Sequence, residues 1–159
     1  MSIRIGDRIP STVLSQMSKN GPQPVPTTEY FAGRKVVLFS VPGAFTPTCS
    51  AYHLPGFVEQ AAEFSNKGVD AIACMAVNDV FVMHAWGKSA KADGIDMLAD
   101  GNGDFTRALG LELDGSAFGM GQRSQRFALV AEEGIVTQLM VEAPGEFRVS
   151  SAESILNTL

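Results

Sequence analysis

Three apolar stretches along the chain are each short enough to be a β-strand. KVVLFSV spans residues 35–41, VDAIACMAV spans 69–77 and IDMLAD spans 95–100. The first two show none of the apolar–polar alternation of a strand with one face in water, so we expect central strands covered on both faces. The pattern therefore predicts the interior of a sheet.

The segment after the first strand has helical features. Thr46 or Thr48 is expected to cap a helix that runs to about Asn66, where a Lys-Gly pair is a stop signal. Pro55 lies inside this helix and is expected to kink it, because proline has no backbone N–H to bond the preceding turn.

Two further helices are expected in the middle of the chain. Asn78 or Asp79 is predicted to cap a helix that ends near Lys91. DFTRALG, residues 104–110, is predicted to be a short helix closed by its glycine.

A hairpin and a last helix are expected near the C-terminus. Residues 125–143 predict two strands around an AEEG turn, and Ser150 with Glu153 has the spacing of a capping box that opens a helix. Near the N-terminus, residues 18–33 contain three prolines and are predicted to be a surface loop leading into a short helical turn.

The order of these elements is βαβαβα, then a hairpin, then a helix. Strands that alternate with helices predict a parallel sheet wrapped by helices, to which the hairpin adds antiparallel strands. We therefore expect an α/β protein with a thioredoxin-like fold, in which a central mixed sheet is flanked by helices. Residues 1–159 fit one such domain.

Composition narrows the class of partners. The formal net charge is −5, and 45% of the residues are hydrophobic while 18% are charged. An acidic surface repels phosphate backbones, so nucleic-acid binding is not expected. No apolar run approaches the roughly 20 residues of a membrane span, and residues 1–14 show no signal-peptide stretch.

The chain has two cysteines and two histidines, so neither a disulfide scaffold nor a zinc site is expected. With so few cysteines, the reducing cytoplasm is the expected compartment.

One of these cysteines occupies a position suited to chemistry. In VPGAFTPTCSAYHLPGF, residues 41–57, Cys49 lies where a strand gives way to a helix. Unpaired backbone N–H groups and the helix dipole stabilise a thiolate there. Thr46 precedes it by three residues, so its hydroxyl can face the sulfur, and Pro42 can wall off the pocket without offering an N–H.

A positive group is also needed, to stabilise a departing oxyanion. Arg123 and Arg126 are the candidates in QRSQRF, and in one strand residues three apart face opposite ways, so only one is expected to point at Cys49.

These residues carry a resemblance. Pro42, Thr46 and Cys49 match the P-x-x-x-T-x-x-C signature of peroxiredoxins, and the whole stretch 41–57 resembles the type II (atypical, peroxiredoxin-5-like) subfamily. WGK at 86–88, LELD at 111–114 and RSQRFALV are also similar, and the resemblance extends from about Gly6 to Leu159.

The resemblance implies a thiol-dependent peroxidase that reduces hydrogen peroxide and alkyl hydroperoxides, with a role in antioxidant defence. Cys49 would be the nucleophile that becomes a sulfenic acid, and Thr46 and Arg126 would bind and polarise the peroxide. The resemblance also implies a homodimer and no bound cofactor.

The step that reduces oxidised Cys49 is expected to differ from that of many type II relatives, because those relatives carry a resolving cysteine near the C-terminus. Residues 144–159 contain no cysteine. Cys74 lies within a predicted central strand and is interpreted as a buried thiol, too fixed to reach Cys49. We therefore expect an external thiol to resolve the sulfenic acid, namely glutathione with glutaredoxin, with thioredoxin as the alternative.

Several neighbours of the site have open roles. His53 follows Cys49 by one turn and either tunes the thiolate or is structural. Phe45, Trp86 and Phe118 belong either to the rim of the site and a dimer contact or to the core.

Two other functions remain open from the residues. One is a Cys–His hydrolase with His53 as base, weakened because His84 is the only other histidine. The other is a redox sensor or holdase that binds partners when Cys49 is oxidised.

Overall fold

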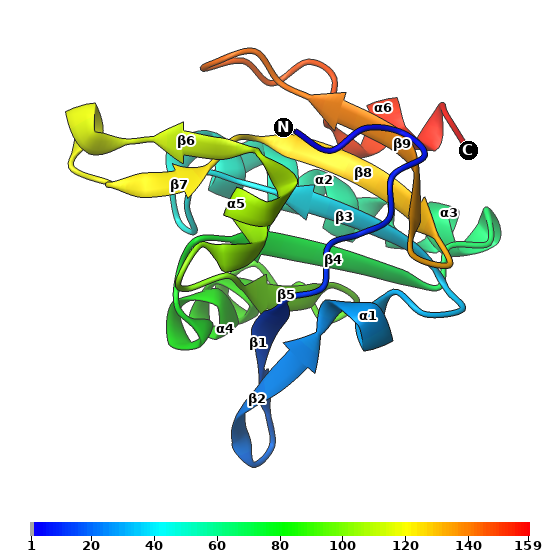
Figure 1. The fold of residues 1–159 in the computed structure, drawn as a ribbon, viewed down its shortest axis with the longest axis horizontal. Coiled ribbons are helices and arrows are strands. Elements are labelled where there is room, and N and C mark those ends of the chain that lie inside the picture. Colours follow the sequence, from blue (N-terminus) through cyan, green and yellow to red (C-terminus); the bar gives the residue numbers. More distant parts are fainter. Residues whose placement is uncertain (1) are drawn as a thin grey trace.

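The computed structural model describes residues 2–159 and contains one large sheet with helices on both sides (Figure 1). The large sheet has seven strands in the order β2-β1-β5-β4-β3-β8-β9, and a separate two-stranded sheet pairs β6 with β7. The strands are β1 (Val13–Ser18), β2 (Gly21–Pro26), β3 (Lys35–Ser40), β4 (Ala71–Ala76), β5 (Asp96–Ala99), β6 (Glu112–Asp114), β7 (Gln122–Ser124), β8 (Phe127–Glu132) and β9 (Ile135–Val141). The helical elements are α1 (Thr27–Tyr30), the π-helix η1 (Cys49–His53), α2 (Leu54–Glu59), α3 (Ala61–Asn66), α4 (Val80–Ser89), α5 (Asp104–Leu109), the 3₁₀ helix η2 (Ser116–Phe118) and α6 (Ala152–Leu156).

The expected mixed sheet is confirmed. Strands β3, β4 and β5 are parallel neighbours, whereas β8 runs antiparallel to β3 and forms a hairpin with β9. The turn of that hairpin is Glu133-Gly134, and both residues have positive φ, as the tight turn of a hairpin requires.

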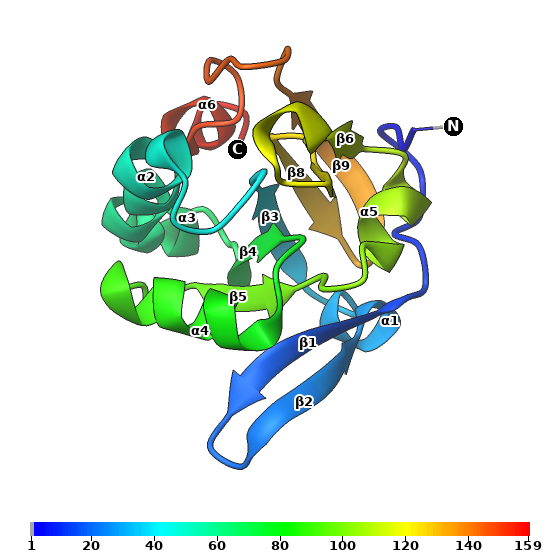
Figure 2. The ribbon, with the colours of Figure 1, turned by 90° about the vertical axis from the view of Figure 1, so that its left-hand side faces the viewer.

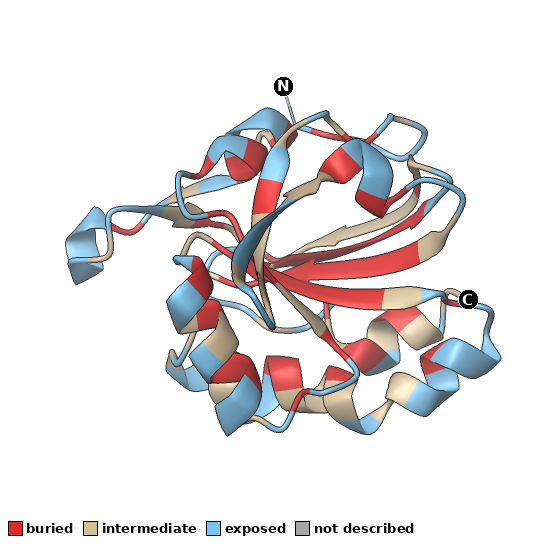
Figure 3. Ribbon diagram, turned by 90° about the horizontal axis from the view of Figure 1, so that it is seen from below, coloured by how far each residue is buried: buried red, intermediate tan, exposed pale blue. Residues whose placement is uncertain are grey.

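Both faces of the central strands are buried, as the unbroken apolar runs predict. Along β3, Val37 and Phe39 join one core, whereas Val36 and Leu38 join the other. Helices α2, α3, α4 and α6 cover the first face, and α1, α5 and the N-terminal segment cover the second (Figure 2). In Figure 3 the central strands between these layers are almost wholly buried, and the α-helices turn buried residues toward them.

The prediction of a loop over residues 18–33 is wrong for its first half. Strand β2 pairs there with β1, at the outer edge of the sheet, and α1 follows as the expected helical turn. The three prolines of β2 are spaced by two, so their nitrogens all lie on the side away from β1. An edge strand tolerates prolines in this arrangement because no ladder hydrogen bond is lost.

The helix after β3 is less regular than expected. It starts with the π-helical turn η1, where the Leu54 N–H bonds the Cys49 carbonyl, and it is interrupted again at Gln60. Pro55 lacks the N–H that would bond the Ala51 carbonyl in an α-helix, so the wide turn comes directly before it.

The helix caps are partly as expected. Asp79 caps α4 by accepting from the Val82 N–H, and Gly110 closes α5 in the left-handed region. Helix α4 ends at Ser89, before Lys91. The predicted capping box at Ser150 is wrong, because Ser151 accepts from the Ser154 N–H while Ser150 is bound elsewhere.

Candidate active site

The loop that leads from β3 to η1 emerges at the carboxyl edge of the parallel strands. In Figure 2 this loop faces the viewer between α4, the arm formed by β6 and β7, and the segment before α6. Asn78, which follows β4, holds the loop: its Oδ1 accepts from the Ala44 N–H at 2.9 Å. The sequence suggested Asn78 only as a possible helix cap.

Thr46 and Cys49 meet across the first turn, as their spacing predicts. Thr46 Oγ1 lies 2.8 Å from Cys49 Sγ and 2.7 Å from the Gly43 carbonyl oxygen. The hydroxyl has a single proton, so it donates to one of these at a time. Neither Thr46 nor Thr48 makes a side-chain cap to η1. The hydroxyl of Thr46 is therefore available for a hydrogen bond to Cys49 Sγ.

The turn that presents Thr46 is strained. Phe45 has φ 63°, in the left-handed region that a bulky side chain rarely adopts. Gly43, two residues earlier, is closely surrounded: an added Cβ would lie 2.9 Å from Arg123 Nη1 and 3.2 Å from Thr46 Cγ2, so these side chains would have to shift. The turn therefore packs closely against Thr46.

Arg126 reaches the sulfur from the junction between β7 and β8. Its Nη2 donates to Cys49 Sγ at 3.1 Å, and its Nη1 donates to His53 Nδ1 at 2.8 Å. The carbon Cζ of the guanidinium lies 5.7 Å from the centre of the Phe147 ring. One planar group therefore joins the cysteine and the histidine of η1.

Arg123 takes a different position. It donates to the Met120 carbonyl at 2.9 Å and to the Pro42 carbonyl at 3.3 Å. The argument that one strand carries both arginines is wrong, because β7 ends at Ser124 and β8 begins at Phe127. Nevertheless, of the two arginines Arg126 contacts Cys49 Sγ, while Arg123 supports the loop through Pro42.

A pocket of about 560 Å³ opens beside Arg126, the residue that donates to Cys49 Sγ. Pro42 and Thr48 also line it, together with residues of the β6–β7 arm and residues 142–146. Cys49 itself is 0% exposed and is not among the lining residues, so Arg126 is the group that connects its sulfur with the pocket.

The second cysteine is remote from solvent. Cys74 lies in β4, is fully buried and packs in the same core as Cys49. Burial raises the pKa of its thiol well above the usual value, and the nearby Cys49 adds to this effect. Cys74 is therefore unsuited to form a thiolate at neutral pH.

His53 lies deep in the site and has no charge at neutral pH. Burial, and then the Arg126 guanidinium, lower its pKa to about 3. Its Nε2 is 2.9 Å from the Ser150 carbonyl oxygen, so both ring nitrogens are occupied by groups other than Cys49. This arrangement weighs against the Cys–His hydrolase, which needs a base that bonds the nucleophile.

One residue near His53 escaped the sequence analysis. Glu142 has a buried carboxylate that accepts hydrogen bonds from four donor groups of residues 148–150. These donors are three backbone N–H groups and the Ser150 hydroxyl, which lies at 2.7 Å. Burial opposes its ionisation, but these hydrogen bonds outweigh that effect and hold its pKa below the usual value. No local motif marks Glu142, since its partners follow after a loop.

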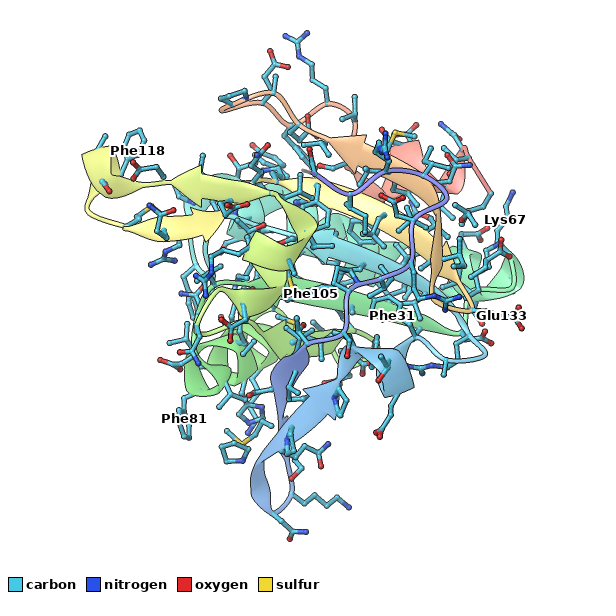
Figure 4. The ribbon with its side chains drawn as sticks, viewed as in Figure 1. Phe31, Lys67, Phe81, Phe105, Phe118 and Glu133 are labelled. Atoms are coloured by element: carbon cyan, nitrogen blue, oxygen red, sulfur yellow. The ribbon has the colours of Figure 1, made fainter. Side chains whose placement is uncertain are left out.

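The three aromatic residues that the sequence left open divide between core and surface. Trp86 is 2% exposed, and its Nε1 donates to Ser50 Oγ at 3.1 Å, so it belongs to the core. Phe45 and Phe118 are exposed. Phe118 lies at the tip of the β6–β7 arm, on the same side of the molecule as the exposed Phe81 of α4 (Figure 4).

Within residues 2–159, no helix is long and apolar enough to cross a bilayer. The same residues contain no group of three or more His, Cys, Asp or Glu side chains arranged to hold a metal ion.

Comparisons with known proteins point to one family. The Redoxin family profile matches residues 4–156. The chain is 51% identical to peroxiredoxin-2E-2, chloroplastic, of Oryza sativa subsp. japonica, over 99% of this chain and 73% of that protein. It is 50% identical to peroxiredoxin-2B of Arabidopsis thaliana, over 99% and 98% of the two chains. A crystal structure of reduced Prx3 from Vibrio vulnificus in complex with hydrogen peroxide is 54% identical, with a TM-score of 0.96 over 98% of each chain.

Proposed function

The chain belongs to the redoxin family and is a peroxiredoxin, a thiol peroxidase with the thioredoxin-like fold, and from this premise we propose that its reaction proceeds through Cys49 with Thr46 and Arg126. The observation that carries this assignment is the convergence of two donors on one sulfur. Thr46 Oγ1 lies at 2.8 Å and Arg126 Nη2 at 3.1 Å from Cys49 Sγ. Pro42, the fourth residue proposed for the site, lines the pocket beside Arg126.

The first step is attack of the Cys49 thiolate on one oxygen of the peroxide. The S–O bond forms as the O–O bond breaks, the sulfur is oxidised by two electrons to a sulfenic acid, and the second oxygen leaves as hydroxide or alkoxide and takes a proton. Arg126 donates to the oxygen on which negative charge develops, and Thr46 turns its hydroxyl from the sulfur to the peroxide. Each preorganised donor contributes on the order of 3 kcal/mol to such a transition state.

The proposed substrates are hydrogen peroxide and small alkyl hydroperoxides. The reacting end of the peroxide has to fit between Arg126 and Thr46, while an organic group extends into the pocket beside the β6–β7 arm. Leu113, Phe118 and Met120 supply apolar surface along this pocket. One of the related structures is described as a complex with hydrogen peroxide, which supports this substrate class.

The sulfenic acid is proposed to be resolved by an external thiol. Attack of glutathione on the sulfenic sulfur releases water and leaves a mixed disulfide, which glutaredoxin reduces; thioredoxin is the alternative donor. The complete burial of Cys74 in β4 supports an external thiol. No cysteine occurs in residues 144–159.

The protein is further proposed to act as a homodimer in the cytoplasm. Phe45 is an exposed residue of the active-site loop itself, and the exposed Phe81 and Phe118 lie on one side of the molecule (Figure 4). These aromatic side chains would supply apolar area for a second copy. One relative is named chloroplastic and another is not, so the compartment is proposed from the cysteine content alone.

A steady-state assay of peroxide consumption tests the proposal. Wild-type protein is assayed with glutathione plus glutaredoxin and, separately, with thioredoxin plus its reductase. We expect sustained turnover with the first donor system, none for Cys49→Ser, and most of the wild-type rate for Cys74→Ser. Turnover by Cys49→Ser would disprove the assignment, and oxidation without turnover under both donor systems would favour a redox sensor.

A further inference from the structure

His53 is fully buried, and both of its ring nitrogens have a partner. Arg126 Nη1 lies 2.8 Å from Nδ1, and the Ser150 carbonyl oxygen lies 2.9 Å from Nε2. A guanidinium group only donates and a carbonyl only accepts. Nε2 therefore carries the proton and Nδ1 presents its lone pair, which assigns the ring a single neutral tautomer.

The Ser150 carbonyl is itself held by Glu142. The Glu142 carboxylate accepts from the Arg148 N–H at 2.9 Å and from the N–H groups of Val149 and Ser150 at 2.8 Å. It also accepts from the Ser150 hydroxyl at 2.7 Å. A buried carboxylate with this many donors fixes the segment before α6, and so fixes the acceptor to which His53 is bonded.

We propose that His53 is a positioning residue, which sets the plane of the Arg126 guanidinium so that Nη2 stays directed at Cys49 Sγ and at the peroxide. This role rests on the proposed function of Cys49 and Arg126. A free arginine side chain has many rotamers, and a hydrogen bond at Nη1 removes most of them. The chain of contacts runs from Glu142 through Ser150 and His53 to Arg126.

The surroundings of His53 favour the neutral ring on which this role depends. The aromatic rings of Phe39, Phe57 and Phe147 pack around it at 4.8–5.7 Å between centroids. The charged groups that face it are Arg126 and Glu142. A protonated ring would direct an N–H at the guanidinium, so the positioning contact and the neutral state require each other.

Two amide substitutions separate the two hydrogen bonds of the ring. In His53→Asn the side-chain oxygen takes the place of Nδ1 and can accept from Arg126, but the side chain is too short to reach Ser150. In His53→Gln the amide takes the place of Nε2 and can donate to Ser150, but Arg126 has no acceptor. The same two substitutions at His84, on α4 and away from the site, are the matched controls.

The measured quantity is the rate constant for oxidation of Cys49 by hydrogen peroxide divided by the rate constant for its alkylation by iodoacetamide. Alkylation is the reference reaction, because it has no leaving peroxide oxygen that needs a hydrogen-bond donor. We expect His53→Gln to lower this ratio about 10-fold or more, the effect of one misplaced charged donor. His53→Asn keeps the ratio within about 3-fold of wild type but melts at a lower temperature, because the Ser150 carbonyl is left unpaired. The His84 variants change neither quantity.

Equal ratios for His53→Asn and His53→Gln, or a lower ratio for His53→Asn, would overturn the positioning role. A purely structural role predicts lower melting temperatures with an unchanged ratio. Failure of the proposed function is recognised separately, because Cys49 of the wild-type protein would then react no faster with peroxide than an ordinary thiol.

Discussion

Arg126 Nη2 lies 3.1 Å from Cys49 Sγ, although the two residues are 77 positions apart in the chain. The cysteine comes from the helix that follows β3, and the arginine comes from the junction that leads into β8. Since β3 and β8 are paired neighbours in the sheet, the pairing brings these two ends together. The contact is thus a consequence of strand order.

The different contacts of the two arginines predict different kinetic effects. Arg126→Ala should lower the second-order rate constant for Cys49 oxidation by about 100-fold or more, as loss of a preorganised charged donor does. Stopped-flow oxidation by hydrogen peroxide measures this effect.

Arg123→Ala is the matched control for this prediction. Arg123 bonds the Pro42 and Met120 carbonyls and not the sulfur, so its loss should weaken the loop with a smaller change in rate. A larger rate loss for Arg123→Ala than for Arg126→Ala would contradict the assignment of Arg126 as the donor.

The position of Cys74 predicts the oxidation state of each cysteine after peroxide treatment and before any thiol donor is added. One equivalent of peroxide should add one oxygen to Cys49 and leave Cys74 as a free thiol, because a fully buried strand residue cannot approach another cysteine without local unfolding. Mass spectrometry of the non-reduced protein provides the measurement. A dominant Cys49–Cys74 disulfide within one chain would show that the cycle uses both cysteines.

The neutral state of buried His53 predicts a loss of stability in mild acid. Its pKa is about 3 in the folded protein, against an ordinary value of 6.5, so between these values the unfolded chain binds more protons. The free energy of unfolding should therefore fall as the pH falls from above 6.5, by about 2 kcal/mol between pH 7 and pH 5. Urea titrations at several pH values measure this slope.

The His53→Asn variant isolates the contribution of the histidine to this slope. Its unfolding free energy should change little between pH 7 and pH 5, whereas the His84→Asn control should keep the wild-type dependence. Glu142 acts in the same direction at lower pH, because its lowered pKa makes protonation unfavourable in the folded state. An identical slope for wild type and His53→Asn would refute the prediction.

The exposed aromatic residue at the tip of the β6–β7 arm predicts a specific effect on assembly. Phe118 is 83% exposed, and we expect it to be covered by a second copy. Phe118→Asp should therefore shift the protein from dimer to monomer at micromolar concentration, as measured by light scattering. Val13→Asp, at a 59% exposed position of β1, should leave the dimer intact. Wild-type protein that is monomeric under these conditions would contradict the dimer.

Much of the local structure follows from the residues alone. The unbroken apolar runs predict β3 and β4 with both faces buried, because such strands have no side that tolerates water. Asp79 and Gly110 mark helix ends correctly, since capping depends on residues within a few positions. The meeting of Thr46 and Cys49 across one turn is predictable for the same reason.

The failed predictions concern residues whose partners lie beyond the few positions that a local motif covers. Three prolines suggest a loop, yet β2 is an edge strand, because the pairing with β1 leaves the prolines on its free side. Ser150 has the sequence spacing of a cap, but the buried Glu142 carboxylate binds it, and Ser151 caps α6 instead.

The sequence by itself determined the central strands, the start of α4 at Asp79, the end of α5 at Gly110 and the approach of Thr46 to Cys49, because these depend on residue chemistry and short spacings. The residues alone left Arg123 and Arg126 open, and the family resemblance selected Arg126. Only the tertiary structure shows the contact of Arg126 with Cys49, and the bonds of His53 to Arg126 and Ser150. These contacts join segments 73 to 97 positions apart, and their geometry depends on the order of strands in the sheet and on the path of the loop after β9. Local patterns carry no information on that order, because many strand arrangements bury the same apolar residues.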